Sequence, residues 1–196
     1  MLFRSDLTHP CLAALDRVVA EEDPGVRFLP TSASGPRFTA DAKDYGKGLH
    51  HDVHGPWNWS SDWDEYWAKD DALFRSETGM PGAMDAALIE KYRGDCAALP
   101  ASHANPYWQH SSSWWIQDDL AAGKSLADYV RLSQERQATA LATAARACKS
   151  RFPACGGFLV WMGHDCFPCP VNTAVIDYEA RPKPAYFALQ KVFRGG

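Results

Sequence analysis

The chain has 196 residues, enough for one domain or for part of a larger one, and its 46% hydrophobic and 22% charged residues argue against disorder. A net charge of -4 leaves no basic footprint for nucleic acid or anionic lipid, so neither is expected as a partner. No apolar run reaches the roughly 18 residues that span a bilayer, and the first residues lack the apolar core of a signal peptide.

The first part of the chain predicts one helix followed by three short strands. Residues 11–23 carry apolar side chains at helical spacing, and a proline and a glycine follow them. Strands are predicted over residues 26–34, 48–55 and 72–79, each of which is short and runs into polar residues or a turn.

The second part predicts three helices and one strand. A helix is expected over residues 82–94, and a much longer one over 125–152, where Ser125 has the position of an N-cap. The continuous apolar run in residues 156–165 predicts a strand that is buried on both faces. Residues 184–194 are amphipathic and predict a terminal helix.

Strands that alternate with helices favour an α/β fold with a parallel sheet. Polar residues gather where the predicted strands end, which is the catalytic face of a (β/α)8 barrel. Four strands cannot close such a barrel, since it takes eight strands and about 250 residues. The sequence therefore predicts either an open sheet or part of a barrel.

Glu77 is the strongest single candidate for chemistry. It lies in "LFRSETGMPG", where a short apolar strand meets a turn. A carboxylate at that place can act as a nucleophile or general base in a cleft, although a glutamate of a surface loop would have the same local sequence.

Two further clusters follow predicted strands. Asp52 and His54 share one face of their strand and can orient a hydroxyl group or bind a metal with a third ligand; a half-buried histidine is the simpler alternative. Trp161 and Asp165 lie at the end of the last predicted strand. Trp161 can be a stacking platform for a ligand or a core residue, and Asp165 can accept a hydrogen bond from a ligand hydroxyl or cap a turn.

The chain is also rich in tryptophan, and four of its eight Trp residues lie within eleven positions, beginning at Trp57. Indole rings fill cores, and they equally stack on sugar rings. A cleft lined with Trp, His and carboxylates suits a neutral polyhydroxylated ligand. No phosphate loop, dinucleotide fingerprint or H-E-x-x-H motif is present, and no cofactor is predicted.

The six cysteines include two spacings that resemble metal sites. Cys166 and Cys169 form C-x-x-C, and Cys148 and Cys155 lie upstream. A structural zinc site needs two close ligand pairs, whereas six residues separate the second pair and Cys148 falls within a predicted helix. The pattern favours unpaired, partly buried thiols over a metal or redox site.

Read in order, several motifs resemble glycoside hydrolase family 2, especially its β-mannosidase and exo-glucosaminidase branch. These motifs are "DPGVRFLPTSASG", "HDVHGPW", "FRSETGMPG", "SQERQ" and the long C-terminal stretch that begins with "GGFLVWMGHD". They occur in the family's order and leave only residues 95–125 without a clear match.

The resemblance implies a retaining enzyme on a (β/α)8 barrel, with this chain supplying about strands 5–8 and their helices. Glu77 matches the nucleophile in a Ser-Glu-x-Gly turn, and His54 matches a histidine near the sugar. Trp161 matches the tryptophan under the sugar, and Asp165 matches an acid of the Asn-Asp pair. Trp57 and Asp52, within the matching "HDVHGPW" stretch, are further candidates for substrate binding.

The family's general acid/base is a glutamate that follows asparagine, and no Asn-Glu pair occurs in the chain. His164, Phe167 and Thr78 also differ from the residues usual at their positions, which are Asn, Trp and Phe. We therefore expect residues 1–196 to be a single partial domain, the C-terminal half of a catalytic barrel that is inactive alone on a β-linked saccharide. Its open strand edges predict pairing with the missing barrel half, or self-association.

Two other hypotheses remain from the residues. The first is a non-catalytic carbohydrate-binding or pseudoenzyme module, favoured by the absent acid/base. The second is a metal-dependent hydrolase that uses Asp52, His54 and the C-x-x-C pair.

Overall fold

The computed structural model describes residues 6–195. The helices, in chain order, are α1 (Pro10–Glu22), α2 (Trp63–Lys69), α3 (Ala86–Tyr92), α4 (Asp118–Ala121), α5 (Leu126–Ser150) and α6 (Pro184–Arg194). The strands are β1 (Asp52–His54), β2 (Phe74–Thr78), β3 (Gly82–Ala83), β4 (Phe158–Val160) and β5 (Val171–Asn172). Three short 3-10 turns cover Ala42–Asp44, Pro106–His110 and Ser113–Trp115.

The central sheet has three parallel strands in the order β1-β2-β4. Its register sets His54 beside Glu77 and Thr78 beside Val160, so the ends of the three strands come together at one edge. The two short strands β3 and β5 form a separate antiparallel ribbon. The predicted α/β class is therefore confirmed.

The strand predicted over residues 26–34 is wrong, because that segment forms bends rather than a strand. The chain joins β1 just after it, where Gly35 N donates to Asp52 O and His54 N donates to Phe38 O. A Cβ on Gly35 would lie 2.8 Å from the backbone of Asp52, and Pro30 has no N–H to donate. The segment therefore lies alongside β1 without a regular ladder.

The helix predicted over 82–94 is shorter in the structure, and its first residues form β3. Gly82 lies against α5, where a Cβ would meet Gln137 Oε1 at 2.3 Å. Ala83 N donates to Ser133 Oγ at 3.0 Å, so contacts with α5 hold this segment extended. Helix α3 then ends at Tyr92, and Gly94 takes a φ of +57° beyond it.

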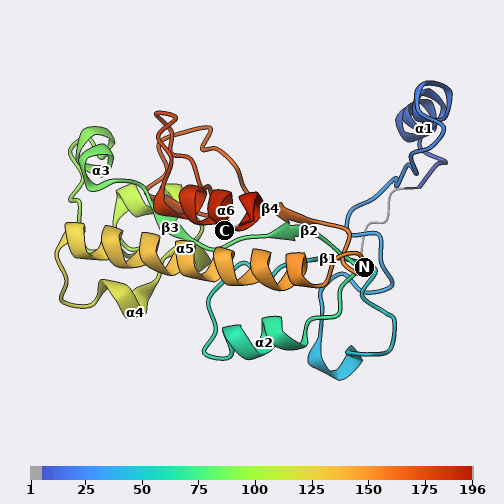
Figure 1. Ribbon diagram of the computed structural model, residues 1–196. Helices are drawn as coiled ribbons and strands as arrows, with labels where there is room; N and C mark the ends of the chain where they lie inside the picture. Colours follow the sequence, from blue (N-terminus) through green and yellow to red (C-terminus); the bar gives the residue numbers. More distant parts are fainter. Residues whose placement is uncertain (1–5, 196) are drawn as a thin grey trace.

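The other helix predictions are confirmed. Ser125 is the N-cap of α5, and its hydroxyl accepts a hydrogen bond from the backbone N of Asp128 at 3.1 Å. In Figure 1, α5 runs along the front of the sheet with α6 packed beside it. Buried Trp, Leu, Val and Ala side chains from α2, α5 and α6, together with Met80 after β2, form the core between these layers.

The strand predicted over 156–165 is confirmed only in its centre, and its expected burial on both faces is wrong. Leu159 in the middle of β4 is 53% exposed. Within residues 6–195, β4 pairs with β2 on one edge and with no strand on the other. The apolar run thus reflects an edge strand that these residues leave uncovered.

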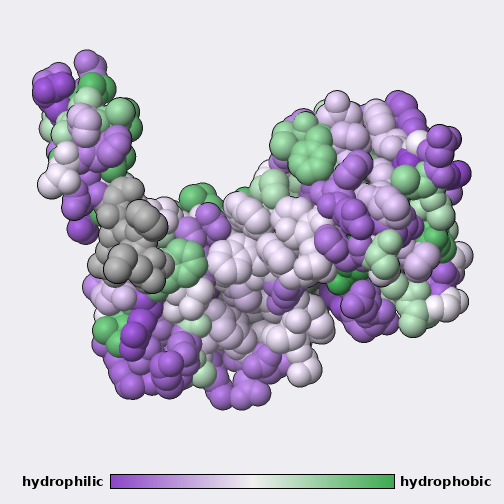
Figure 2. Space-filling view, turned by 180° about the vertical axis from the view of Figure 1, so that it is seen from behind, coloured by the Kyte–Doolittle hydropathy of each residue, from purple (hydrophilic) through white to green (hydrophobic). Residues whose placement is uncertain are grey.

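Helix α1 forms as predicted, but none of its residues is buried. Figures 1 and 2 show it as an arm that stands clear of the main body. Its apolar stripe, which includes Leu15 and Val18, is about half exposed. No helix in the described part of the chain is long and apolar enough to span a bilayer.

Candidate functional site

Glu77 and His54 meet at the ends of β2 and β1. His54 Nδ1 lies 3.5 Å from Glu77 Oε2, and its Nε2 lies 2.8 Å from Ser32 Oγ. Ser32 Oγ also donates to Ser76 Oγ at 3.0 Å. The Glu77 side chain is 31% exposed, whereas that of His54 is 7% exposed. The carboxylate therefore reaches solvent while the imidazole beside it is held in place.

The turn after β1 is fixed by a buried arginine, Arg75, which no sequence motif marked as a site residue. Arg75 Nη1 and Thr78 Oγ1 both donate to Gly55 O, at 2.8 and 3.0 Å. Gly55 has a φ of +75°, a conformation that favours glycine. Arg75 is fully buried and forms an ion pair with Asp70. A charged residue in the middle of a short apolar strand was the available signal for this role.

The turn after β2 brings Trp161 against Thr78 and Gly79, the two residues that follow Glu77. Trp161 N donates to Thr78 O at 2.9 Å, so it directly follows the pairing of β2 with β4. At Gly79 a Cβ would lie 2.3 Å from Trp161 O, closer than any side chain allows. The glycine of the Ser-Glu-x-Gly motif is thus required by the approach of these two strand ends.

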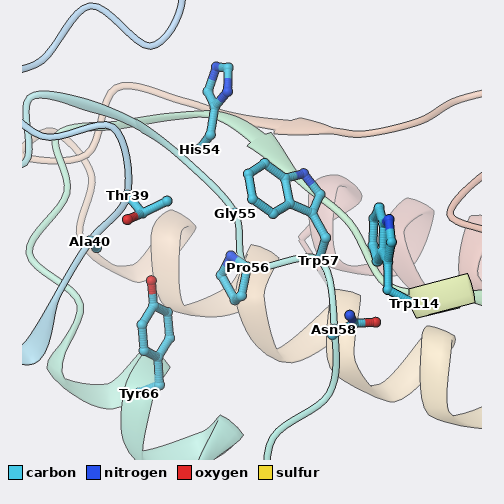
Figure 3. A pocket seen from close by; sticks show the side chains of 9 residues that line it. All are labelled: Thr39, Ala40, His54, Gly55, Pro56, Trp57, Asn58, Tyr66 and Trp114. Atoms are coloured by element: carbon cyan, nitrogen blue, oxygen red, sulfur yellow. The ribbon is translucent and has the colours of Figure 1, made fainter. Parts of the chain in front are cut away.

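An open cavity of about 560 Å³ lies beside the Glu77–His54 pair and is lined in part by His54. Its lining residues are Thr39, Ala40, His54, Gly55, Pro56, Trp57, Asn58, Tyr66 and Trp114 (Figure 3). The ring of Trp161 packs edge-on against Trp57 at 6.3 Å and lies nearly parallel to Trp114 at 6.4 Å. Three indole rings from distant segments therefore form one aromatic surface at the cavity.

Trp57 lines this cavity and Trp161 packs against it, and their binding of substrate stays a prediction. Trp114 was missed because residues 95–125 match no motif, although the "WW" pair at 114–115 was visible. It is 43% exposed, which leaves its ring free to contact a ligand.

Asp52 faces a different hollow from His54. It lines a second cavity of about 380 Å³ beneath the loop of residues 31–34, and its Oδ2 accepts a hydrogen bond from Ser34 N at 2.7 Å. The strand register shifts between Val53 and His54, which separates the two side chains. Asp52 therefore supports the loop that carries Ser32.

Asp165 is 2% exposed, and its carboxylate interacts with two other buried side chains. Its Oδ1 accepts a hydrogen bond from Asn172, and its Oδ2 lies 3.9 Å from Lys183 Nζ. Burial raises the pKa of Asp165 and lowers the pKa of Lys183. The substrate-binding role of Asp165 stays a prediction, since its carboxylate contacts protein groups here.

The described residues contain no group of three or more His, Cys, Asp or Glu side chains arranged to hold a metal ion. The C-x-x-C pair is split, because Cys166 is exposed while Cys169 is buried 3.3 Å from Ser111 Oγ. The metal-dependent hypothesis therefore finds no ligand set in this part of the chain.

The relatives found by comparison with known proteins, in sequence and in structure, include several β-mannosidases. No family model matches the chain. It is 29% identical over 191 residues to β-mannosidase B of Aspergillus niger and 27% identical over 191 residues to that of Aspergillus fumigatus. Each alignment covers 91% of this chain and 22% of the relative. The crystal structure of β-D-mannosidase from Dictyoglomus thermophilum superposes on 90% of the chain with a TM-score of 0.59 and 22% identity.

These relatives confirm the resemblance that the sequence motifs indicated. The chain is similar to β-mannosidases over nine-tenths of its length, and its fold matches part of one of them. It spans about 22% of the length of the curated relatives that it matches.

Proposed function

We propose that this chain is part of a retaining β-glycoside hydrolase of the β-mannosidase type, with Glu77 as its nucleophile. The observation that carries the proposal is the Glu77–His54 pair, which lies at the parallel strand ends beside a tryptophan-lined cavity. Similarity to β-mannosidases over 91% of the chain supports the reaction class.

In this mechanism the Glu77 carboxylate attacks the anomeric carbon of a β-linked saccharide while an acid protonates the leaving oxygen. The resulting glycosyl ester is then hydrolysed by water, which restores the carboxylate. His54, fixed by Ser32, holds Glu77 Oε2 in its orientation. The indole surface of Trp57, Trp114 and Trp161 supplies apolar area for sugar rings.

The second carboxylate is proposed to come from outside this chain. Retaining enzymes hold their two carboxyl groups about 5–5.5 Å apart. The Oδ2 of Asp52 supports the 31–34 loop, and Asp165 is buried against Lys183, so neither is assigned as the acid. The chain alone is then expected to be inactive.

We further propose that β1, β2 and β4 belong to a (β/α)8 barrel, with the preceding irregular segment in the place of strand five. Three observations support the barrel: the strands are parallel, their polar residues gather at one edge of the sheet, and the outer edge of β4 is uncovered. The missing half would pair with the open edges, and a second copy of the chain is the competing partner.

The test is covalent labelling of the full-length protein that carries this chain. A 2-deoxy-2-fluoro-β-mannoside with a dinitrophenyl leaving group should form a stable ester on Glu77, located by peptide mass spectrometry. Glu77→Gln should lose hydrolysis by about 10³-fold or more, while the exposed Glu90→Gln should leave it unchanged. A label on another carboxylate would remove the assignment of Glu77.

A non-catalytic sugar-binding module is the second candidate. The internal contacts of Asp52 and Asp165, the two carboxylates considered for the role of the acid, favour it. It predicts that mannosides quench Trp fluorescence in the full-length protein without turnover or labelling of Glu77.

A further inference from the structure

Cys148 and Cys155 lie at the opposite end of the sheet from Glu77. Cys148 is in the last turn of α5, and Cys155 comes just before β4. The two side chains lie close enough to interact with each other, and each residue is 3% exposed. The sequence spacing had favoured separate thiols, but the chain turns back after α5, with Cys155 N donating to Arg151 O at 3.1 Å.

Both thiols open onto one cavity of about 400 Å³, which gives a small reagent a path to them. The cavity is lined by Phe152, Phe158 and Phe193 together with Ala145, Lys149 and two glycines. Phe152 is 75% exposed at its rim, and the Lys149 ammonium lies near the end of α6. The thiols are therefore covered by side chains but not sealed in the core.

We propose that Cys148 and Cys155 form a redox-active dithiol, which an anionic low-molecular-weight disulfide such as glutathione disulfide oxidises to an intramolecular disulfide. These two cysteines do not contact the proposed glycosidase site and have no role in it.

The chemistry takes two thiol–disulfide exchanges. The Cys155 thiolate attacks one sulfur of the small disulfide, forms a mixed disulfide and releases one small thiolate. Cys148 then attacks the Cys155 sulfur, its proton passes to solvent, and the second small thiolate leaves. The two protein thiols are oxidised to one disulfide, and the small disulfide is reduced to two thiols.

The surroundings suit these two roles. The hydrogen-bonding interaction with Cys148 lowers the pKa of Cys155, and contacts with Gly157 and the Arg151 guanidinium act in the same direction, whereas burial and the nearby Asp70 oppose them. The same interaction and burial raise the pKa of Cys148. Arg151 Nη2 also donates to Cys148 Sγ at 3.8 Å. Within the proposal, the direction of these shifts assigns the attacking thiolate to Cys155 and the resolving thiol to Cys148.

The C-x-x-C pair provides the internal comparison. Its spacing is the one usually associated with redox proteins, but Cys169 is hydrogen-bonded to Ser111 while Cys166 is exposed. The structure therefore assigns dithiol reactivity to the pair that is farther apart in sequence.

The experiment treats the reduced chain with glutathione disulfide under native conditions. The wild-type chain should lose two of its six thiols, with a mass decrease of two hydrogen atoms and no retained glutathione. Trypsin cuts after Lys149 and Arg151, and chymotrypsin cuts after Phe158, so Cys148 and Cys155 fall on separate peptides, free of Cys166. A linked pair of these peptides is the expected product.

Two variants complete the test. Cys148→Ser should keep glutathione on Cys155 and form no internal disulfide, whereas Cys166→Ser should still lose two thiols. The proposal is overturned if the wild type links other cysteines, retains glutathione as a mixed disulfide, or keeps both thiols when the denatured chain loses them. Because the wild-type peptide map decides the matter, a variant that misfolds does not weaken the test.

Discussion

Replacing Arg75 by methionine tests whether this buried arginine holds the turn that presents His54. The methionine fills a similar space but removes the ion pair with Asp70 and the donor to Gly55 O. It also removes the hydrogen bond to Tyr66 Oη at 2.9 Å and the guanidinium that lies 4.8 Å from the Trp67 ring centre.

The expected loss follows from burial. Removing one partner of a buried ion pair costs about 3–5 kcal/mol, because the other charge stays in the interior. Asp70 retains its second partner, Arg151, so the lower end, about 3 kcal/mol, applies. For a chain of this size that corresponds to a fall in Tm of roughly 6–12 °C.

Thermal unfolding followed by circular dichroism measures the loss. Arg131→Met is the matched control, since it removes an arginine whose ion pair with Glu135 is on the surface, and its Tm should equal that of the wild type. A Tm for Arg75→Met within about 2 °C of the wild type, less than 1 kcal/mol, would refute the reasoning.

Three further predictions concern a close backbone approach, a helix cap and a hydrogen-bonded carboxylate. Gly79→Ala should cost about 1–3 kcal/mol in urea unfolding and shift Trp fluorescence, since its Cβ would displace Trp161 O; unchanged spectra would contradict this. Ser125→Ala should lower stability by about 1 kcal/mol by removing the α5 cap, and Ser125→Asp should restore it. Burial tends to raise the pKa of Asp71, but hydrogen bonds from His50 and Gly46 N hold it below its ordinary value. The unfolded chain then binds more protons, so stability is lost as pH falls below about 4, and Asp71→Asn should flatten that part of the acid unfolding curve.

The helices were predicted with the best success because their signals are local. The α5 cap depends on Ser125 and a backbone N–H three residues later, and the amphipathic stripe of α6 depends on a period of 3.6 residues. The same applies to the sites at strand ends. Glu77 and His54 could be found because each lies near the end of a predicted strand, within two residues of a glycine.

The sequence could not predict which elements pack against each other or which faces become buried. The sequence predicted a doubly buried strand where β4 is an open edge, and a regular strand where residues 26–34 form bends. Periodicity specifies which side chains share a face, but not what covers that face. Helix α1 shows the same limit, since its apolar stripe forms and remains exposed.

The sequence by itself determined the α/β class, the position of Glu77 in its turn and the similarity to β-mannosidases, because these depend on residues close together or in fixed order. Only the tertiary structure brought Ser32 to His54, Trp114 to Trp161, and Cys148 to Cys155. It also buried Asp165 against Lys183 and Arg75 beneath Gly55. Each of these contacts joins side chains through the folding of the backbone between them, and no spacing in the sequence specifies that path.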